Sequence, residues 1–147
     1  MPLTISRAGA DLPEGYELLR QIASDEGYNF VARLGARWRV GVYDIDDRAT
    51  VRYAHNEGAL IAIGAQTFDE YDPGPDQRRI RHFYVTSAAR RGGVGRALAN
   101  TLIQDAFAIA PKLTLRATYD RSKAFWESIG FTPVSNREDR THEMLRP

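Results

Sequence analysis

Hydrophobic and polar residues follow two different periods along this chain. Alternation at every second residue is typical of strands, and apolar residues three or four positions apart are typical of helices. Alternating stretches and short apolar runs predict strands over 3–7, 50–55, 59–67, 80–85, 113–117, 131–134 and 141–145. Helical spacing predicts helices over 14–26, over a short stretch after Asn29, from 94 to about 109, and from 120 or 122 to 129. Interleaved strands and helices favour a mixed α/β fold.

Turn residues separate these elements. Asn56-Glu57-Gly58 joins two strands as a hairpin, Pro111 ends the long helix, and Gly130 follows the last helix. The stretch 69–76 is a loop by composition and holds four carboxylates in eight residues. No repeat or linker interrupts this order, so we expect one domain over 1–147.

Composition narrows the class of protein. A chain of 147 residues with 43% hydrophobic residues buries a core of its own, and a net charge of +1 argues against a nucleic-acid partner. The absence of cysteine excludes disulfides and cysteine chemistry, and we expect no metal site. No apolar run is long enough for a membrane span, and no signal peptide is recognisable, so we expect a cytoplasmic protein without a membrane partner.

The turn Arg90-Arg91-Gly92-Gly93-Val94-Gly95-Arg96 lies between the strand 80–85 and the long helix. Glycines let a backbone approach a ligand, and the first N–H groups of a helix have no partner within it. These groups and the positive end of the helix dipole bind phosphate. The turn therefore predicts a site for a phosphorylated cofactor.

Two common phosphate loops do not fit this turn. Walker A ends in Gly-Lys-Ser/Thr, whereas this chain has Gly95-Arg96-Ala97. The dinucleotide fingerprint needs a third glycine, which is Leu98 here, and a position after the first strand of a βαβ unit.

A third pattern does fit. Arg90-x-x-Gly93-x-Gly95 resembles the acyl-CoA-binding motif of the GNAT acetyltransferase superfamily, and Ser122-Lys123-Ala124-Phe125-Trp126-Glu127-Ser128-Ile129-Gly130-Phe131 resembles a later segment of that family. The resemblance implies the GNAT fold, with six to seven strands in a mixed sheet, about four helices, and a V-shaped split between the fourth and fifth strands, here 80–85 and 113–117. It implies acetyl-CoA as the cofactor. The residues that it places on CoA are Phe83, Tyr84, Val85, Arg90, Arg91, Gly92, Gly93, Val94, Gly95, Arg96, Tyr119, Ser122 and Phe125.

The implied reaction is direct transfer of an acetyl group to a primary amine of a small molecule or protein. The family's usual acid is a tyrosine, but the position holds Trp126, whose indole N–H does not act as a proton donor near neutral pH. Trp126 is then expected only to line the thioester pocket, or the hydroxyl of Tyr119 serves as the acid in its place. The alternative role of Tyr119 is packing or a hydrogen bond to the cofactor. Many members of the family have a glutamate near the start of the fourth strand, but the equivalent region here, 78–81, holds no carboxylate. His82 is therefore the candidate base, with a structural strand histidine as the alternative.

These patterns do not determine which amine is the acceptor or whether the protein is an oligomer. The acidic loop 69–76 either attracts a cationic amine or is a solvated turn. His142 is a second candidate near the acceptor, and Tyr16, Tyr28, Phe30 and Trp38 are expected in the core. Similar domains often form homodimers. Because the usual tyrosine and glutamate are missing, a weakly catalytic acyl-CoA-binding module for sensing or assembly is the alternative function, and a nucleotide-binding protein is a third.

Overall fold

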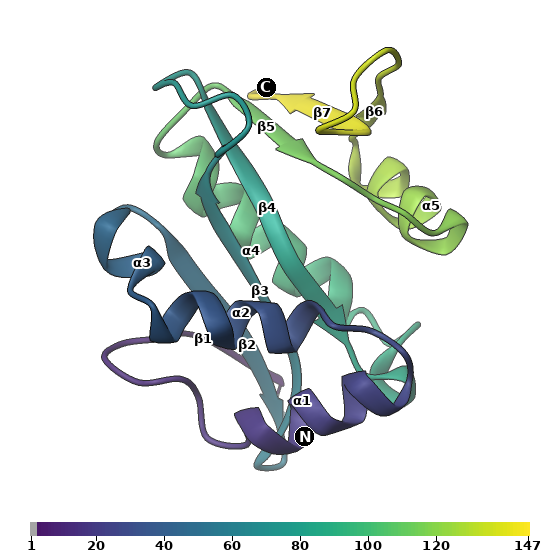
Figure 1. Cartoon of the computed structure of the whole chain (residues 1–147). Coiled ribbons are helices and arrows are strands. Elements are labelled where there is room, and N and C mark those ends of the chain that lie inside the picture. Colours follow the sequence, from purple (N-terminus) through teal and green to yellow (C-terminus); the bar gives the residue numbers. More distant parts are fainter. Residues whose placement is uncertain (1–2) are drawn as a thin grey trace.

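A computed structural model describes residues 3–147 of the chain. Seven strands form one sheet in the order β1-β2-β3-β4-β5-β7-β6 (Figure 1). The pairing is antiparallel except between β4 and β5, which run parallel. The strands are β1 (Leu3–Arg7), β2 (Thr50–Asn56), β3 (Ala59–Phe68), β4 (Gln77–Val85), β5 (Lys112–Leu115), β6 (Thr132–Pro133) and β7 (His142–Leu145).

The strands β4 and β5 pair over only three residues each. Gln77–Arg79 lie beside Lys112–Thr114, and beyond Arg79 the two strands separate. On its other side, β4 carries a bulge, because His82 and Phe83 together oppose Gly64 of β3. A bulge bends its strand and increases the local twist. The bulge therefore follows shortly after the point at which β4 leaves β5.

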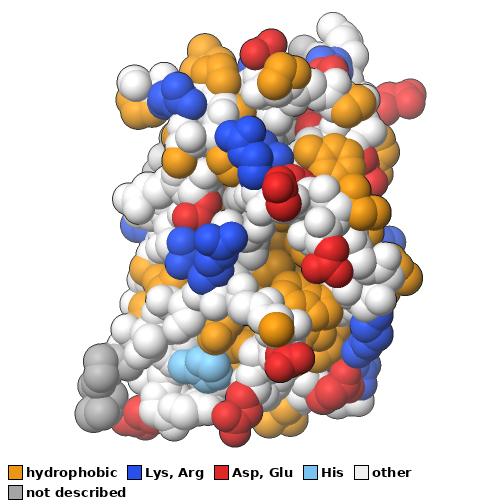
Figure 2. Space-filling model, turned by 90° about the vertical axis from the view of Figure 1, so that its left-hand side faces the viewer, with side chains coloured by type: hydrophobic (Ala, Val, Ile, Leu, Met, Phe, Trp, Pro, Cys, Tyr) orange, Lys and Arg blue, Asp and Glu red, His pale blue; other side chains and the backbone are white. Residues whose placement is uncertain are grey.

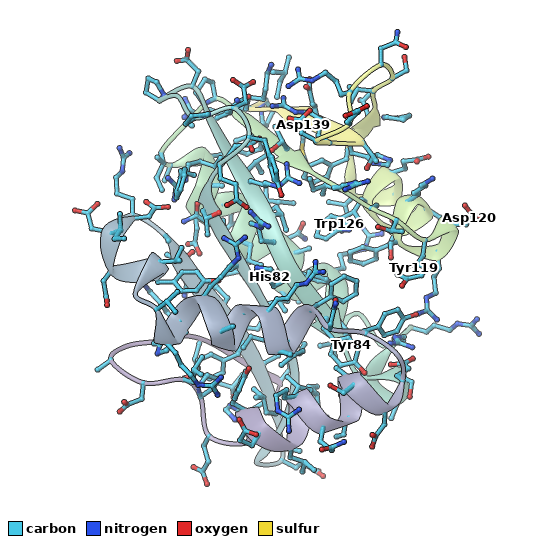
Figure 3. All side chains as sticks on the ribbon, viewed as in Figure 1. His82, Tyr84, Tyr119, Asp120, Trp126 and Asp139 are labelled. Atoms are coloured by element: carbon cyan, nitrogen blue, oxygen red, sulfur yellow. The ribbon has the colours of Figure 1, made fainter. Side chains whose placement is uncertain are left out.

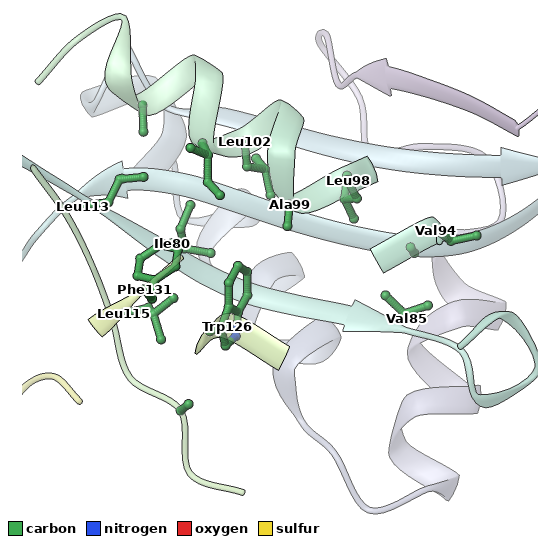
Figure 4. Close-up of a cluster of buried hydrophobic side chains, with 14 of the residues drawn as sticks. Ile80, Val85, Val94, Leu98, Ala99, Leu102, Leu113, Leu115, Trp126 and Phe131 are labelled. Atoms are coloured by element: carbon green, nitrogen blue, oxygen red, sulfur yellow. The ribbon is translucent and has the colours of Figure 1, made fainter. Parts of the chain in front are cut away.

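Helices cover the sheet on both faces. On one face, α1 (Tyr16–Asp25) and α2 (Phe30–Arg39) bury Leu19, Leu34 and Tyr84 in one cluster, and the short α3 (Val42–Ile45) follows α2. On the other face, α4 (Val94–Phe107) packs its apolar side onto β3, β4 and β5. The helix α5 (Asp120–Ile129) adds Trp126 to this second cluster, which Figure 4 shows.

The predicted fold class is confirmed, with a mixed seven-stranded sheet and a parallel pair of strands that part. Several elements differ from expectation: β5 ends at Leu115 rather than at residue 117, and β6 covers only Thr132–Pro133 of the expected 131–134. β4 begins at Gln77 rather than at residue 80, because Arg78 and Arg79 are buried with Asp46 and Asp69 as charge partners. The helix α3 was not predicted, since its four residues are too few to show a helical period. No helix within residues 3–147 is long and apolar enough to cross a membrane.

Candidate active site

A cavity of about 680 Å³ lies between β4, the end of β5, α5 and the start of α4. Figure 3 shows Tyr119 and Trp126 on the α5 side and His82 and Tyr84 on the β4 side. All but two of the predicted site residues line this cavity: His82, Phe83, Tyr84, Val85, Arg90, Arg91, Gly93, Gly95, Arg96, Tyr119, Ser122, Phe125 and Trp126. Gly92 and Val94 do not line it. Gly92 is exposed, and the Val94 side chain packs in the core.

The turn before α4 is shaped to present its N–H groups. Arg91 and Gly93 have positive φ angles of 70° and 85°, and Gly93 is the N-cap of α4. Within residues 3–147, none of the backbone N–H groups of 91–96 donates to a protein acceptor, whereas Ala97 N–H donates to Gly93. Six unpaired donors at a helix N-terminus form a suitable cradle for a pyrophosphate.

The Arg90 side chain holds this turn to the rest of the protein. Its guanidinium makes a two-pronged ion pair with Glu26, at 2.6 and 2.8 Å, and its Nε donates to Val85 O at 3.1 Å. Tyr84 Oη donates to the same Glu26 carboxylate at 2.6 Å. The hydrogen bond from Arg90 lowers the pKa of Glu26, so the carboxylate stays ionised. Arg90 thus positions the loop, and the free N–H groups are left for a ligand.

Gly95 lets α4 approach α5 closely. A Cβ atom at this position would lie 3.3 Å from the Phe125 ring and 3.5 Å from Val85. Phe125, Phe83 and Trp126 lie in mutual contact, with ring centroids 4.9 to 5.6 Å apart, and Trp126 is only 6% exposed. These aromatic rings form an apolar wall beside the point where β4 and β5 separate.

Tyr119 lies at the mouth of the cavity. It is the N-cap residue of α5, is 45% exposed, and makes an edge-on contact with Tyr28 at 5.3 Å between ring centroids. Arg121 donates to Tyr28 Oη at 2.9 Å. Residues of α5 therefore contact the loop between α1 and α2 across the opening between the strands.

His82 is the extra residue of the β4 bulge. Its φ angle is +54°, a conformation that non-glycine residues rarely adopt, and its side chain is 9% exposed. Burial, followed by the charges of Arg81, Arg37 and Arg33, lowers the pKa of His82 to about 3. Its imidazole is therefore neutral near pH 7, and its Nε2 has no hydrogen-bond partner within residues 3–147.

The acidic loop is already paired with arginines. Asp69 is buried beside Arg79 and Arg140, at 3.5 and 3.3 Å, and accepts a hydrogen bond from Thr114. Glu70 pairs with Arg37 and Arg81, and Asp72 pairs with Arg137 and Arg140. These carboxylates stabilise the loop where it meets β4 and β5. Three of the loop's four carboxylates are therefore held in ion pairs, and Asp76 forms none within residues 3–147.

His142 connects α5 to the sheet. Ala117 N–H donates to Thr141 Oγ1, which lies 2.7 Å from His142 Nδ1, and His142 Nε2 lies 2.8 Å from a Glu127 carboxylate oxygen. Because a carboxylate only accepts hydrogen bonds, Nε2–H donates to Glu127, and in the neutral ring Nδ1 is then the acceptor for the Thr141 hydroxyl. His142 does not line the cavity, and its contacts connect α5 with β7.

Other cavity residues were missed or interpreted differently from the sequence. Tyr28 and Phe30 line the cavity as well as packing against the core, whereas Tyr16 and Trp38 lie in the core as expected. Missed lining residues include Arg81, Arg116 and Arg121. The alternation of side chains along the two strands predicted over 80–85 and 113–117 would have indicated that Arg81 and Arg116 face the cavity. Within residues 3–147, no group of three or more His, Cys, Asp or Glu side chains is placed to hold a metal ion.

Comparison with known proteins agrees with this geometry. The sequence profile of the family described as "Acetyltransferase (GNAT) domain" matches residues 45–144, more than half of the chain. No match was found among curated proteins.

Solved structures with the same fold cover nearly the whole chain. A protein from Exiguobacterium sp. 255-15, named an acetyltransferase by inference, is 27% identical, with a TM-score of 0.85 over 99% of this chain and 94% of its own. An acetyltransferase named in the same way, from Clostridium acetobutylicum and solved with acetyl-CoA, is 14% identical, with a TM-score of 0.69 over 92% of this chain and 94% of its own. Glucosamine-6-phosphate N-acetyltransferase from Arabidopsis thaliana is 14% identical, with a TM-score of 0.67 over 93% of this chain and 96% of its own.

Proposed function

Because this chain belongs to the GNAT acetyltransferase family, we propose that it transfers an acetyl group from acetyl-CoA to a primary amine. The observation that carries the proposal is the turn 91–96, whose six backbone N–H groups have no protein acceptor within residues 3–147 and which lines the cavity through Arg91, Gly93, Gly95 and Arg96. In the proposal, the single domain spans residues 1–147, and the acceptor is an amine of a small molecule or a protein.

The residues present fit acetyl-CoA along its length. The N–H groups of 91–96 would hold the pyrophosphate. The edge of β4 that leaves β5 after Arg79 offers backbone groups to the pantetheine amides, in the manner of an added strand. The aromatic wall of Phe83, Phe125 and Trp126 would surround the thioester, which supplies the activated acetyl group.

The chain's own residues then have distinct tasks. A backbone N–H within 83–85 is the proposed donor to the developing oxyanion. Trp126 is packed on several sides by other rings, so we assign it to the thioester wall. Tyr119 is the hydroxyl proposed to protonate the departing thiolate. His82 remains the candidate base, and its lowered pKa makes it a weak one unless a bound substrate changes its surroundings.

The test of the cofactor assignment uses two variants of one glycine. Gly93→Asn and Gly93→Asp have nearly the same shape, and both strain the positive φ of 85°, but only aspartate adds a charge. Like charges 4 Å apart repel by about 4 kcal/mol near a protein surface. We therefore expect CoA to bind Gly93→Asp at least about tenfold more weakly than Gly93→Asn in titration calorimetry, since about 1.4 kcal/mol corresponds to tenfold. Equal affinity of the two variants would contradict a pyrophosphate at this turn.

A second function stays in view because Trp126 replaces the family's tyrosine and His82 is a weak base. A weakly catalytic acyl-CoA-binding module would bind CoA tightly and release no thiol from acetyl-CoA with any amine. Thiol release with a panel of amines separates this alternative from the enzyme.

A further inference from the structure

Arginines gather at the end of the cavity that is remote from the phosphate-binding turn. Arg81 and Arg116 line the cavity there, and Arg33 and Arg37 come from α2, whose Phe30 lines it as well. Residues three, four or seven apart share one helix face, so Arg33 and Arg37 lie on the same side of α2 as Phe30. The charges of both α2 arginines act on His82.

The register of the sheet places Arg81 and Arg116 across the split from each other. Arg79 pairs with Thr114 in the parallel ladder. Arg81, two residues further along β4, projects from the same face as that pair, because side chains alternate along a strand. Arg116 directly follows Leu115, the last residue of β5, and like Arg81 it lines the cavity. The neighbouring Leu115 turns to the opposite face, into the cluster under α4. Two guanidinium groups therefore flank the space in which an acceptor would meet the thioester.

Positive charge at this end is only partly balanced. Glu70 pairs with Arg37 and Arg81, and no other carboxylate within residues 3–147 forms an ion pair with either of them. In the same part of the chain, Arg33 and Arg116 form no ion pair, and both are exposed. On the face that Figure 2 shows, by contrast, acidic and basic side chains are interspersed.

One unpaired polar atom lies at the wall of the cavity. Within residues 3–147, three buried side-chain atoms have no hydrogen-bond partner: Tyr43 Oη, Arg79 Nη1 and His82 Nε2. Tyr43 lines a separate hollow, and Arg79 Nη1 lies 3.5 Å from Asp69 Oδ1, so only His82 is left for a ligand of this cavity. His82 is more than nine-tenths buried and lines the cavity. A buried polar atom without a partner is uncommon and points to a partner supplied from outside the chain.

We propose that the acceptor amine carries an anionic group, a carboxylate or a phosphate, which Arg116 and Arg33 bind while Arg81 adds its charge. The inference rests on the proposed acetyl transfer and specifies its acceptor. The neutral amine nitrogen bonds to the thioester carbonyl carbon, the carbon–sulfur bond breaks, CoA leaves as its thiol, and the nitrogen gives up one proton. A bound anion would also offset the repulsion that opposes protonation of His82.

The test compares amines in matched pairs, with thiol release from acetyl-CoA as the assay. β-Alanine is compared with β-alaninamide and phosphoethanolamine with ethanolamine, with rates corrected for the fraction of neutral amine; spermidine represents polycations. A charge-assisted hydrogen bond contributes enough to change affinity by about tenfold or more. We therefore expect kcat/KM to be at least about tenfold higher for the anionic member of one pair. The responding pair distinguishes carboxylate from phosphate.

Two variants and a control locate the effect. Arg116→Gln and Arg33→Gln should raise KM for the preferred anionic amine by about tenfold and change KM for its uncharged partner little. Arg48→Gln removes an exposed arginine that does not line the cavity and should leave both values unchanged. Equal losses on charged and uncharged amines would contradict anion recognition by these arginines.

The outcomes separate this inference from the proposed function. Acetyl transfer that favours uncharged or polycationic amines would overturn the anionic acceptor and leave the enzyme in place. If no amine is turned over, the melting temperature of the CoA-saturated protein is compared with and without each anionic amine, because a ligand that binds the folded state raises it. A shift with the anionic amines that is lost in Arg116→Gln supports the site, and no shift overturns it. Failure to bind CoA would overturn the proposed function itself.

Discussion

A network of ion pairs lies where β4 and β5 are still paired, and substitutions in it test what holds these two strands together. Arg140 is 1% exposed, and its guanidinium contacts four carboxylates, those of Asp69, Asp72, Asp139 and Glu143. Asp69 in turn accepts a hydrogen bond from Thr114, the last residue of β5 that pairs with β4. Arg140 therefore connects the acidic loop and β7 to the point where β4 and β5 part.

Replacing this arginine should be costly. Arg140→Gln leaves a buried Asp69 with a weaker set of partners, and removing one member of a buried ion pair typically costs about 3–5 kcal/mol. For a chain of this length such a loss lowers the melting temperature by roughly 10–20 °C. Arg140→Lys keeps the charge but loses the planar fork, so we expect an intermediate value. Thermal unfolding followed by circular dichroism measures both variants.

Arg137→Gln is the matched control. Arg137 pairs with Asp72 and Asp139 as well, but its side chain is 41% exposed, and exposed pairs contribute little. Burial works to raise the pKa of Asp139, and Arg137 and Arg140 outweigh it and lower that pKa. A lowered carboxylate pKa stabilises the fold above the unfolded value and loses this effect as pH falls through the folded value. The gap between wild type and Arg140→Gln should thus narrow below about pH 4. Equal melting temperatures for the two glutamine variants at pH 7 would refute the reasoning.

Three further substitutions test the cofactor side of the site. Glu26→Gln releases Arg90 and should weaken CoA binding severalfold while lowering the free energy of unfolding by about 1 kcal/mol. Because the pKa of Glu26 is lowered in the fold, this loss of stability should be present at pH 7 and fade below about pH 4.5, which denaturant titrations at both pH values measure. Trp126→Phe should keep most of the kcat measured by thiol release, since an aromatic wall survives, and a loss above about a hundredfold would instead give the indole N–H a catalytic role. Tyr119→Phe should lower kcat by at least about tenfold with little change in CoA affinity if its hydroxyl is the acid, and an unchanged kcat would reduce Tyr119 to packing against Tyr28.

The cofactor end of the site could be predicted from the sequence because its determinants are local. A strand, a turn with glycines and a helix follow one another within about twenty residues, and the conformation of each is set by neighbours in the chain. The role of Arg90 was not predictable in the same way. Its partner Glu26 lies 64 residues earlier, at the end of α1, and nothing in the spacing of the motif indicates that contact.

The acceptor end depends on contacts between distant segments, which the order of residues along the chain does not reveal. Read alone, the loop 69–76 is a cluster of carboxylates suited to a cation. In the fold it lies beside arginines from α2, β4 and the segment before β7, so Asp69, Glu70 and Asp72 are paired internally. Arg116 forms no ion pair within residues 3–147, and it lines the cavity beyond the point where β4 and β5 part after Arg79. The sign of charge offered to a substrate is thus a property of which ion pairs the topology completes.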